Sequence, residues 1–110
     1  MLDLIIKNGQ CYINGELKNV DVSVKNGKIQ GIGKIAEEAK DIIDAKGLTV
    51  LPGCIDTQTH FREPGSTDTE DLHSGSRAAI VGGITAVFEM PNTNPPTSTK
   101  KEFQRKLDLA

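Results

Sequence analysis

The sequence predicts an α/β protein in which a small β-rich segment precedes repeated β-α units. Three observations support this fold class. Asn-Gly pairs separate short apolar segments throughout residues 1–51. The pair Pro52-Gly53 then marks a change of pattern. Beyond that pair, strand-like and helix-like segments alternate, which is typical of a parallel sheet with helices against it.

The first 51 residues are typical of short strands joined by tight turns. Asn-Gly favours such turns because residues with positive φ suit the primed turns of hairpins. The three Asn-Gly pairs stand at residues 8–9, 14–15 and 26–27. We expect strands at residues 4–6, 11–13, 20–24, 28–33, 42–45 and 48–51. Together they predict a small antiparallel β unit, with one helical turn at residues 36–40.

The remaining residues predict strand, loop, helix, strand, loop and helix. The first strand covers residues 54–60 at the end of an apolar run that would bury its body. The second is the nearly continuous apolar run of residues 84–90, which is typical of a parallel strand covered on both faces. This order can begin either a parallel barrel or an open sheet.

Helix boundaries follow from capping signals. Thr67 and Glu70 fit a capping box for the first helix, which is expected to run to about Val81. Gly82-Gly83 is expected to end it. The final helix is predicted over residues 99–110, and it has no stop signal before the last residue. We therefore expect the chain to be part of a longer protein.

Polar side chains alternate along the end of the first parallel strand. Asp56, Gln58, His60 and Arg62 stand two residues apart, so on a strand they would share one face. Asn92 follows the second strand. Because functional groups gather at the C-terminal ends of parallel strands, we expect these side chains to be neighbours. The pattern predicts a site built from an imidazole, a guanidinium and an amide.

Each of these side chains also has a structural interpretation. His60 can be a hydrogen-bonded structural group at a strand end. Arg62 can form an ion pair with Glu63 or Asp68. Asn92 can cap its own loop. The shared strand face favours a site for His60. The local sequence leaves Arg62 open and favours a loop-capping role for Asn92.

Composition excludes some function classes. The 13 Lys and Arg residues nearly balance 15 Asp and Glu residues, and these charges are scattered. The sequence therefore has no basic patch for nucleic acid or an anionic membrane. Cys11 and Cys54 lack zinc-like spacing, so we expect both to be reduced packing residues in a cytoplasmic protein, with a disulfide as the alternative.

Two motifs together resemble those of dihydroorotase, a cyclic amide hydrolase of the amidohydrolase superfamily. The first is His-Phe-Arg-Glu-Pro-Gly at residues 60–65, after Pro-Gly-Cys-Ile-Asp at 52–56, and the second is Met-Pro-Asn-Thr at 90–93. The resemblance implies that residues 1–51 are the N-terminal part of a small β-sandwich. It implies that residues 52–110 hold the first two β/α units of a TIM-type (β/α)8 barrel, which is therefore incomplete.

The resemblance also implies a function and a role for each site residue. The reaction would be the reversible cyclisation of N-carbamoyl-L-aspartate to L-dihydroorotate in pyrimidine biosynthesis. One or two zinc ions would activate a water molecule and polarise the ring carbonyl. His60 would be a zinc ligand, and Arg62 and Asn92 would hold the substrate carboxylate. Asp56 would support the strand end behind them.

Two departures from the family pattern qualify this expectation. Gln58 stands where the family has His, and an amide oxygen is a weaker zinc ligand than an imidazole. The barrel needs about 250 residues, so the catalytic groups are expected downstream and residues 1–110 alone are expected to be inactive. The alternative is a silent dihydroorotase-like scaffold for aspartate transcarbamoylase, or else a stand-alone binding domain. A homodimer is also expected.

Overall fold

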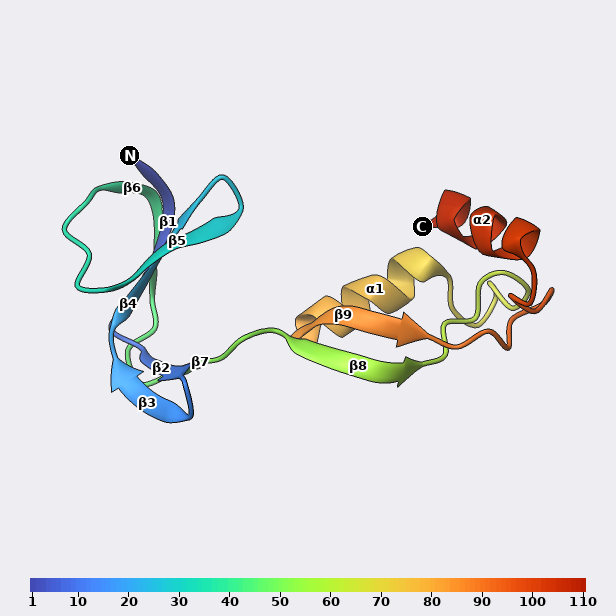
Figure 1. Cartoon of the computed structure of the whole chain (residues 1–110), viewed down its shortest axis with the longest axis horizontal. Helices are drawn as coiled ribbons and strands as arrows, with labels where there is room; N and C mark the ends of the chain where they lie inside the picture. Colours follow the sequence, from blue (N-terminus) through green and yellow to red (C-terminus); the bar gives the residue numbers. More distant parts are fainter. The chain divides into compact units, whose positions relative to one another are not determined.

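The computed structural model describes all of residues 1–110 and divides the chain into two compact units (Figure 1). The units are Met1–Pro52 and Gly53–Ala110. The first unit contains only strands, whereas the second contains two strands and two helices. The α/β class predicted from the sequence is confirmed.

The first unit consists of two small sheets. Its strands are β1 (Leu2–Lys7), β2 (Gln10–Ile13), β3 (Glu16–Asn19), β4 (Asp21–Lys25), β5 (Lys28–Gly33), β6 (Ala39–Asp44) and β7 (Thr49–Val50). One sheet has the order β5-β4-β1-β6 and the other has the order β3-β2-β7. The expectation of a wholly antiparallel unit is wrong, because β1 pairs with β6 in parallel and β2 pairs with β7 in parallel.

Two of the three Asn-Gly pairs form the predicted hairpin turns. Residues 14–15 join β2 to β3 and residues 26–27 join β4 to β5, and φ is positive at both residues of each pair. The third pair behaves differently. Asn8 has a φ of 63°, but Gly9 is buried between strands, where an added Cβ would lie 2.7 Å from a methyl carbon of Val50. The chain passes there from one sheet to the other.

The core of the first unit is small and aliphatic. Its most buried side chains are Leu2 and Ile5, which are 1% and 0% exposed. Cys11, Val22 and Ala45 complete the buried hydrophobic set in this unit. Cys11 is a free thiol that packs as predicted, and its Sγ donates to the Val20 carbonyl 3.2 Å away.

Residues 36–40 form no helical turn, contrary to the prediction. Ala39 and Lys40 begin β6 and pair with β1, a contact that local sequence cannot reveal. The carboxylate of Asp3 joins this edge to a turn, because it accepts from Lys40 Nζ at 2.7 Å and from the Asn26 amide at 2.6 Å. Both hydrogen bonds lower the pKa of Asp3, and the bond from Lys40 makes the larger contribution.

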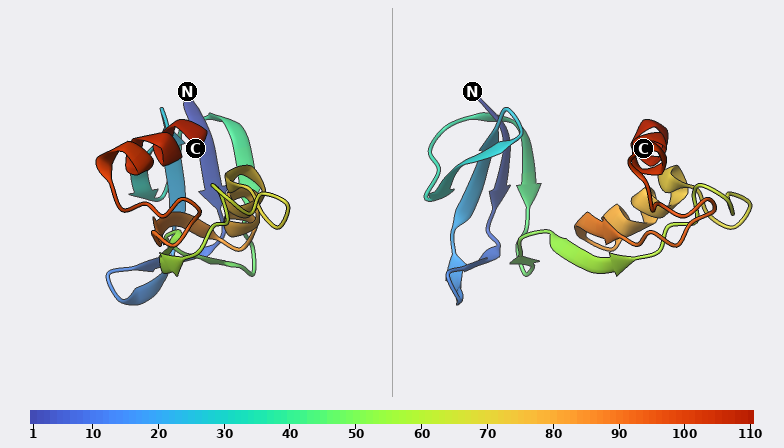
Figure 2. Two further views of the ribbon diagram at one scale, coloured as in Figure 1. Left: turned by 90° about the vertical axis from the view of Figure 1, so that its right-hand side faces the viewer. Right: turned by 45° about the vertical axis from the view of Figure 1, so that its right-hand side comes forward.

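The second unit is the predicted β-α-β unit followed by a further helix. Its elements are β8 (Cys54–Thr59), α1 (Leu72–Val81), β9 (Ile84–Glu89) and α2 (Lys100–Leu109). Strands β8 and β9 are parallel, and α1 lies along one side of them (Figures 1 and 2). Neither helix is long and apolar enough to cross a membrane.

The N-cap of α1 lies four residues later than predicted, at Asp71 instead of Thr67. The structure places the capping box at Asp71 and Ser74, whereas residues 67–69 form a turn closed on Ser66. Asp71 accepts from the Ser74 amide at 2.6 Å, and this bond is the main cause of a lowered pKa of Asp71. The predicted end at Gly82 is confirmed.

The parallel strands are covered on one side only. Phe88 on β9 is 60% exposed, so the expectation that this strand is covered on both faces is wrong for that residue. Ile55 on β8 is 59% exposed, although the apolar run that ends there predicted a buried strand body. Cys54 is also exposed rather than packed, although both cysteines are free. Two strands and one overlying helix cannot enclose both faces of a sheet.

Candidate functional site

The candidate site lies where β8 and β9 end. Because the two strands are parallel, the loops that follow them emerge at the same edge. The Met90 amide donates to the Thr59 carbonyl at 2.8 Å and so closes the strand pair at that edge. The loop of residues 60–71 and the loop of residues 90–99 both begin there.

Backbone contacts join these two loops directly. The Asn94 amide donates to the Pro64 carbonyl at 3.0 Å. Gly65 has a φ of 121°, and an added Cβ would lie 2.7 Å from Asn94 Cβ. The close approach leaves no room for a side chain at Gly65. The first loop therefore carries a glycine for a packing reason, which the motif alone did not indicate.

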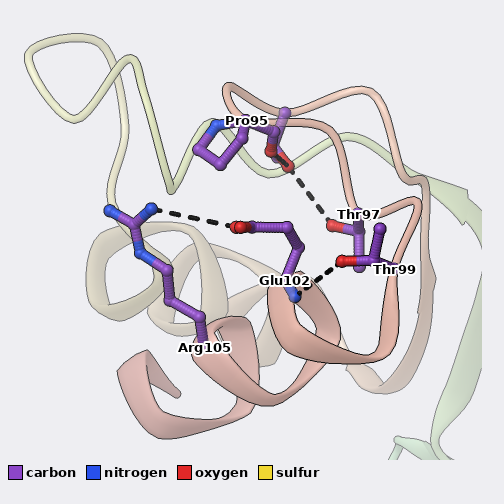
Figure 3. Close-up of polar contacts among 6 residues, drawn as sticks. Pro95, Thr97, Thr99, Glu102 and Arg105 are labelled. Carbon is purple, nitrogen blue, oxygen red and sulfur yellow. Dashed lines mark hydrogen bonds and ion pairs between the residues drawn. The ribbon is translucent and has the colours of Figure 1, made fainter.

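The second loop has its own internal bonds, which Figure 3 shows in part. Thr93 Oγ1 donates to the Pro95 carbonyl at 3.0 Å and lies 3.4 Å from Thr97 Oγ1. The loop leads into α2, whose N-cap is Thr99, and the Glu102 amide donates to the Thr99 hydroxyl at 3.2 Å. The sequence did not predict the hydrogen bonds of Thr93 and Thr97, because Thr hydroxyls in loops give no distinct signal.

His60 and Asn92 meet at the strand ends, as the sequence predicted. His60 Nδ1 lies 2.9 Å from Asn92 Oδ1, and both side chains are exposed. An amide oxygen only accepts, so the imidazole nitrogen must donate. The contact joins a residue just after β8 to a residue just after β9. The structural interpretation of His60, a hydrogen-bonded group at a strand end, is therefore compatible with a site.

Asp56 and Gln58 lie within β8, ahead of the meeting point. Asp56 Oδ1 accepts from the Gln58 amide at 2.9 Å, so this half-buried carboxylate braces its own strand. The pairing of β8 with β9 is irregular between Asp56 and Thr59. The side chains of β8 therefore do not alternate regularly, and the predicted single face of polar residues is interrupted. Gln58 is exposed.

Arg62 lies in the loop rather than on the strand, because β8 ends at Thr59. Its side chain is exposed and forms no ion pair, so the suggested partners Glu63 and Asp68 do not hold it. Glu63 instead accepts from the Leu72 amide at 2.8 Å and helps to cap α1. The guanidinium therefore remains available to a ligand.

The residues that could hold a metal ion form an incomplete set. No three His, Cys, Asp or Glu side chains in residues 1–110 are placed to bind one ion together. Catalytic zinc sites use three protein ligands. His60 fits one such position, because Nδ1 is occupied by Asn92 and Nε2 remains free. Gln58 offers a weaker oxygen donor.

Comparisons with known proteins agree on the family. Residues 49–108 match the model of the amidohydrolase family. The chain is 47% identical over 109 residues to allantoinases of Salmonella choleraesuis (strain SC-B67) and of Escherichia coli O1:K1 / APEC. These matches cover 98% of this chain and 24% of each relative, so the chain spans about a quarter of their length.

The chain is also similar to solved structures of amide hydrolases. L-hydantoinase (dihydropyrimidinase) from Arthrobacter aurescens is similar over 100% of this chain and 25% of its own, with 36% identity and a TM-score of 0.89. A D-hydantoinase is similar over 100% of this chain with 35% identity and a TM-score of 0.80. An N-acyl-D-glutamate deacylase from Bordetella bronchiseptica, solved with zinc and a phosphonate inhibitor, covers 78% of this chain at 30% identity and a TM-score of 0.63.

These findings confirm part of the expectation and correct the rest. The β-sandwich start followed by the beginning of a TIM-type barrel is confirmed by the hydantoinase similarity. Dihydroorotase is wrong, because the relatives at 47% identity are named allantoinase and the similar structures are named hydantoinase. The dihydroorotase-like scaffold loses its basis with that correction. By its match over residues 49–108, the chain belongs to the amidohydrolase family.

Proposed function

We propose that the protein containing this chain hydrolyses a cyclic amide, with allantoin as the first candidate substrate. The 47% identity to allantoinases over 98% of the chain is the observation that carries this proposal. The similarity to L-hydantoinase and D-hydantoinase supports the same class of substrate, a small ring that contains an amide bond.

The site residues have proposed roles in this reaction. His60 would be a metal ligand through Nε2, with Gln58 as a weaker neighbouring donor. Arg62 would donate to substrate oxygens, which ring carbonyls can provide as well as a carboxylate can. Asn92 retains two free N–H donors on Nδ2 and would bond the substrate with them. Asp56 would keep the end of β8 in place.

Zinc is the proposed metal, since the deacylase of similar structure was solved with it. When bound, zinc would activate water and polarise the carbonyl that is attacked. The contribution of residues 1–110 is one imidazole and the loops around it. The remaining ligands and the general base are proposed to lie outside residues 1–110 in the full-length protein. Cytoplasmic location and a homodimer stay predictions.

The test is a substrate panel for the full-length gene product that contains residues 1–110. We expect turnover of allantoin to exceed that of hydantoin and dihydrouracil, and His60→Ala to abolish it. Chelation should remove activity, and added zinc should restore it. Turnover of dihydroorotate alone, or of none of these rings, would contradict the proposal.

A further inference from the structure

We propose that Asn92 is a positioning residue that fixes the tautomer of His60. In this arrangement the Asn92 side-chain oxygen accepts the proton on His60 Nδ1, and Nε2 is left as the unprotonated nitrogen. The inference rests on the proposed function, because it gives His60 a task as a metal ligand. It adds a role for Asn92 that is separate from substrate binding.

The tautomer follows from the geometry of one hydrogen bond. Asn92 Oδ1 lies 2.9 Å from His60 Nδ1, an ordinary hydrogen-bond distance. The oxygen has no proton to give, so the proton lies on Nδ1. A neutral imidazole carries one N–H only, so Nε2 has its lone pair free. Metal-binding His residues commonly use this arrangement, with the other ring nitrogen donating to an oxygen.

Backbone hydrogen bonds hold the loop that carries Asn92. The Thr97 amide donates to the Pro91 carbonyl at 2.9 Å and closes the loop around Asn92. The bond from Met90 to Thr59 fixes its start against the end of β8. His60 directly follows Thr59, so the two partners are placed by the same strand end. The hydrogen bond is therefore preorganised by backbone contacts.

The oxygen and the nitrogen of the Asn92 side-chain amide can bond to two different partners. Oδ1 is engaged by His60, while the Nδ2 group has no partner in residues 1–110. The substrate role of Asn92 proposed above requires only these N–H donors. The oxygen and the amino group can thus be tested separately by choosing the substitution.

The experiment compares three variants of the full-length gene product. Asn92→Leu removes the acceptor with little change in volume, and Asn92→Asp retains an acceptor at that position. Asn94→Ala is the matched control, because Asn94 lies in the same loop and its exposed side chain makes no hydrogen bond. Melting temperatures establish that each variant is folded. If Asn92→Leu does not fold, Asn92→Ala replaces it in the same comparison.

Two readouts do not depend on catalysis. The first is the 15N NMR spectrum of metal-free protein labelled at histidine, at about pH 9, where imidazole is neutral. His60→Gln identifies the His60 signals. The second is the zinc dissociation constant measured by competition with a chelator. Wild type, Asn92→Asp and Asn94→Ala should show the Nδ1–H tautomer, and the last should bind zinc as wild type does.

Asn92→Leu should shift His60 toward the Nε2–H form and weaken zinc binding by about 10- to 100-fold, the usual effect of losing such a partner. An unchanged tautomer in Asn92→Leu, with a zinc dissociation constant within about twofold of wild type, would overturn the inference. A shifted tautomer in a protein that does not hydrolyse allantoin would refute the proposed function alone. Allantoin hydrolysis with an unshifted tautomer would refute the inference alone.

Discussion

Phe61 packs so closely on Gly75 that helix α1 has no room for a side chain at that position. A Cβ added to Gly75 would lie 2.7 Å from Phe61 Cδ1 and 2.8 Å from Cε1. Phe61 is only 9% exposed, although it follows the exposed His60. The ring anchors the first site loop to the helix, and the glycine makes that contact possible.

Gly75→Ala should therefore destabilise the protein, even though Ala favours a helix by about 1 kcal/mol over Gly. Overpacking against an aromatic ring costs about 1–3 kcal/mol, which outweighs that gain. Denaturant unfolding measures the difference. Gly82→Ala is the control, since an added Cβ there would meet its nearest atom at 3.4 Å. A stabilised Gly75→Ala variant would show that the ring moves aside at little cost.

The ion pair between Lys106 and Glu89 joins α2 to β9. Lys106 Nζ lies 2.8 Å from Glu89 Oε2, and the two side chains are 12% and 17% exposed. Apart from this ion pair the Glu89 carboxylate has no hydrogen-bond partner. Lys106→Met should cost about 1–3 kcal/mol, because it leaves a poorly solvated carboxylate unpaired.

A double-mutant cycle with Glu89→Gln isolates the coupling between these two residues, which we expect to be about 0.5–3 kcal/mol. The exposed pair Lys18–Glu16, with side chains 46% and 71% exposed, provides the comparison. Its coupling should not exceed about 1 kcal/mol. Equal couplings in the two cycles would mean that burial does not strengthen the Lys106 pair.

Asp71 should make the stability of α1 depend on pH. Its folded-state pKa lies below the ordinary value of 3.8, chiefly because the Ser74 amide donates to the carboxylate. The stabilisation is fully present above about pH 4 and is lost as the pH falls through the lower folded pKa. Asn also caps helices but does not titrate.

The melting temperature of wild type relative to Asp71→Asn should therefore be constant near neutral pH and decline below about pH 4. Thermal unfolding followed by circular dichroism from pH 7 to 2 gives the comparison. Asp68→Asn is the control, because Asp68 is exposed and its side chain makes no hydrogen bond. If the difference in melting temperature between wild type and Asp71→Asn does not change with pH, titration of the Asp71 carboxylate does not control the stability of α1.

The structural features that are determined by residues close together in the sequence were predictable. The turns at residues 14–15 and 26–27 follow from Asn-Gly chemistry, and the end of α1 follows from Gly82. The start of α1 was not predictable, because both Thr67 and Asp71 suit a cap. The structure selects the later start, where Glu63 also accepts from the Leu72 amide. That bond comes from a loop residue nine positions away.

Contacts between distant residues account for the other errors. The parallel pairing of β1 with β6 joins residues about 37 positions apart, and no local pattern records it. At the site, the meeting of His60 and Asn92 was predictable because parallel strands end at one edge. The prediction that the polar residues share one strand face failed, because β8 ends before Arg62 and its pairing with β9 is irregular. The dihydroorotase prediction was wrong because it relied on two short motifs, whereas the 47% identity to allantoinases extends over 98% of the chain.

Gln58→His should increase the zinc affinity of the full-length protein. An imidazole is a stronger zinc ligand than a carboxamide, and position 58 lies two residues before His60 on the same chain segment. Competition with a chelator measures the change. Thr57→His is the control, because residue 57 is also exposed but lies one residue farther from His60 along the chain. No gain in bound zinc for Gln58→His would remove residue 58 from the metal site.

Arg62→Ala should weaken substrate binding without weakening the fold. Its side chain is exposed and makes no ion pair, so its loss should change the free energy of unfolding by less than about 0.5 kcal/mol. If the guanidinium donates to substrate oxygens, KM for the cyclic amide should rise strongly while kcat falls less. Arg62→Lys tests the planar fork, since an ammonium supplies charge without paired donors and should restore KM only in part. If KM is unchanged in both variants, Arg62 does not bind the substrate.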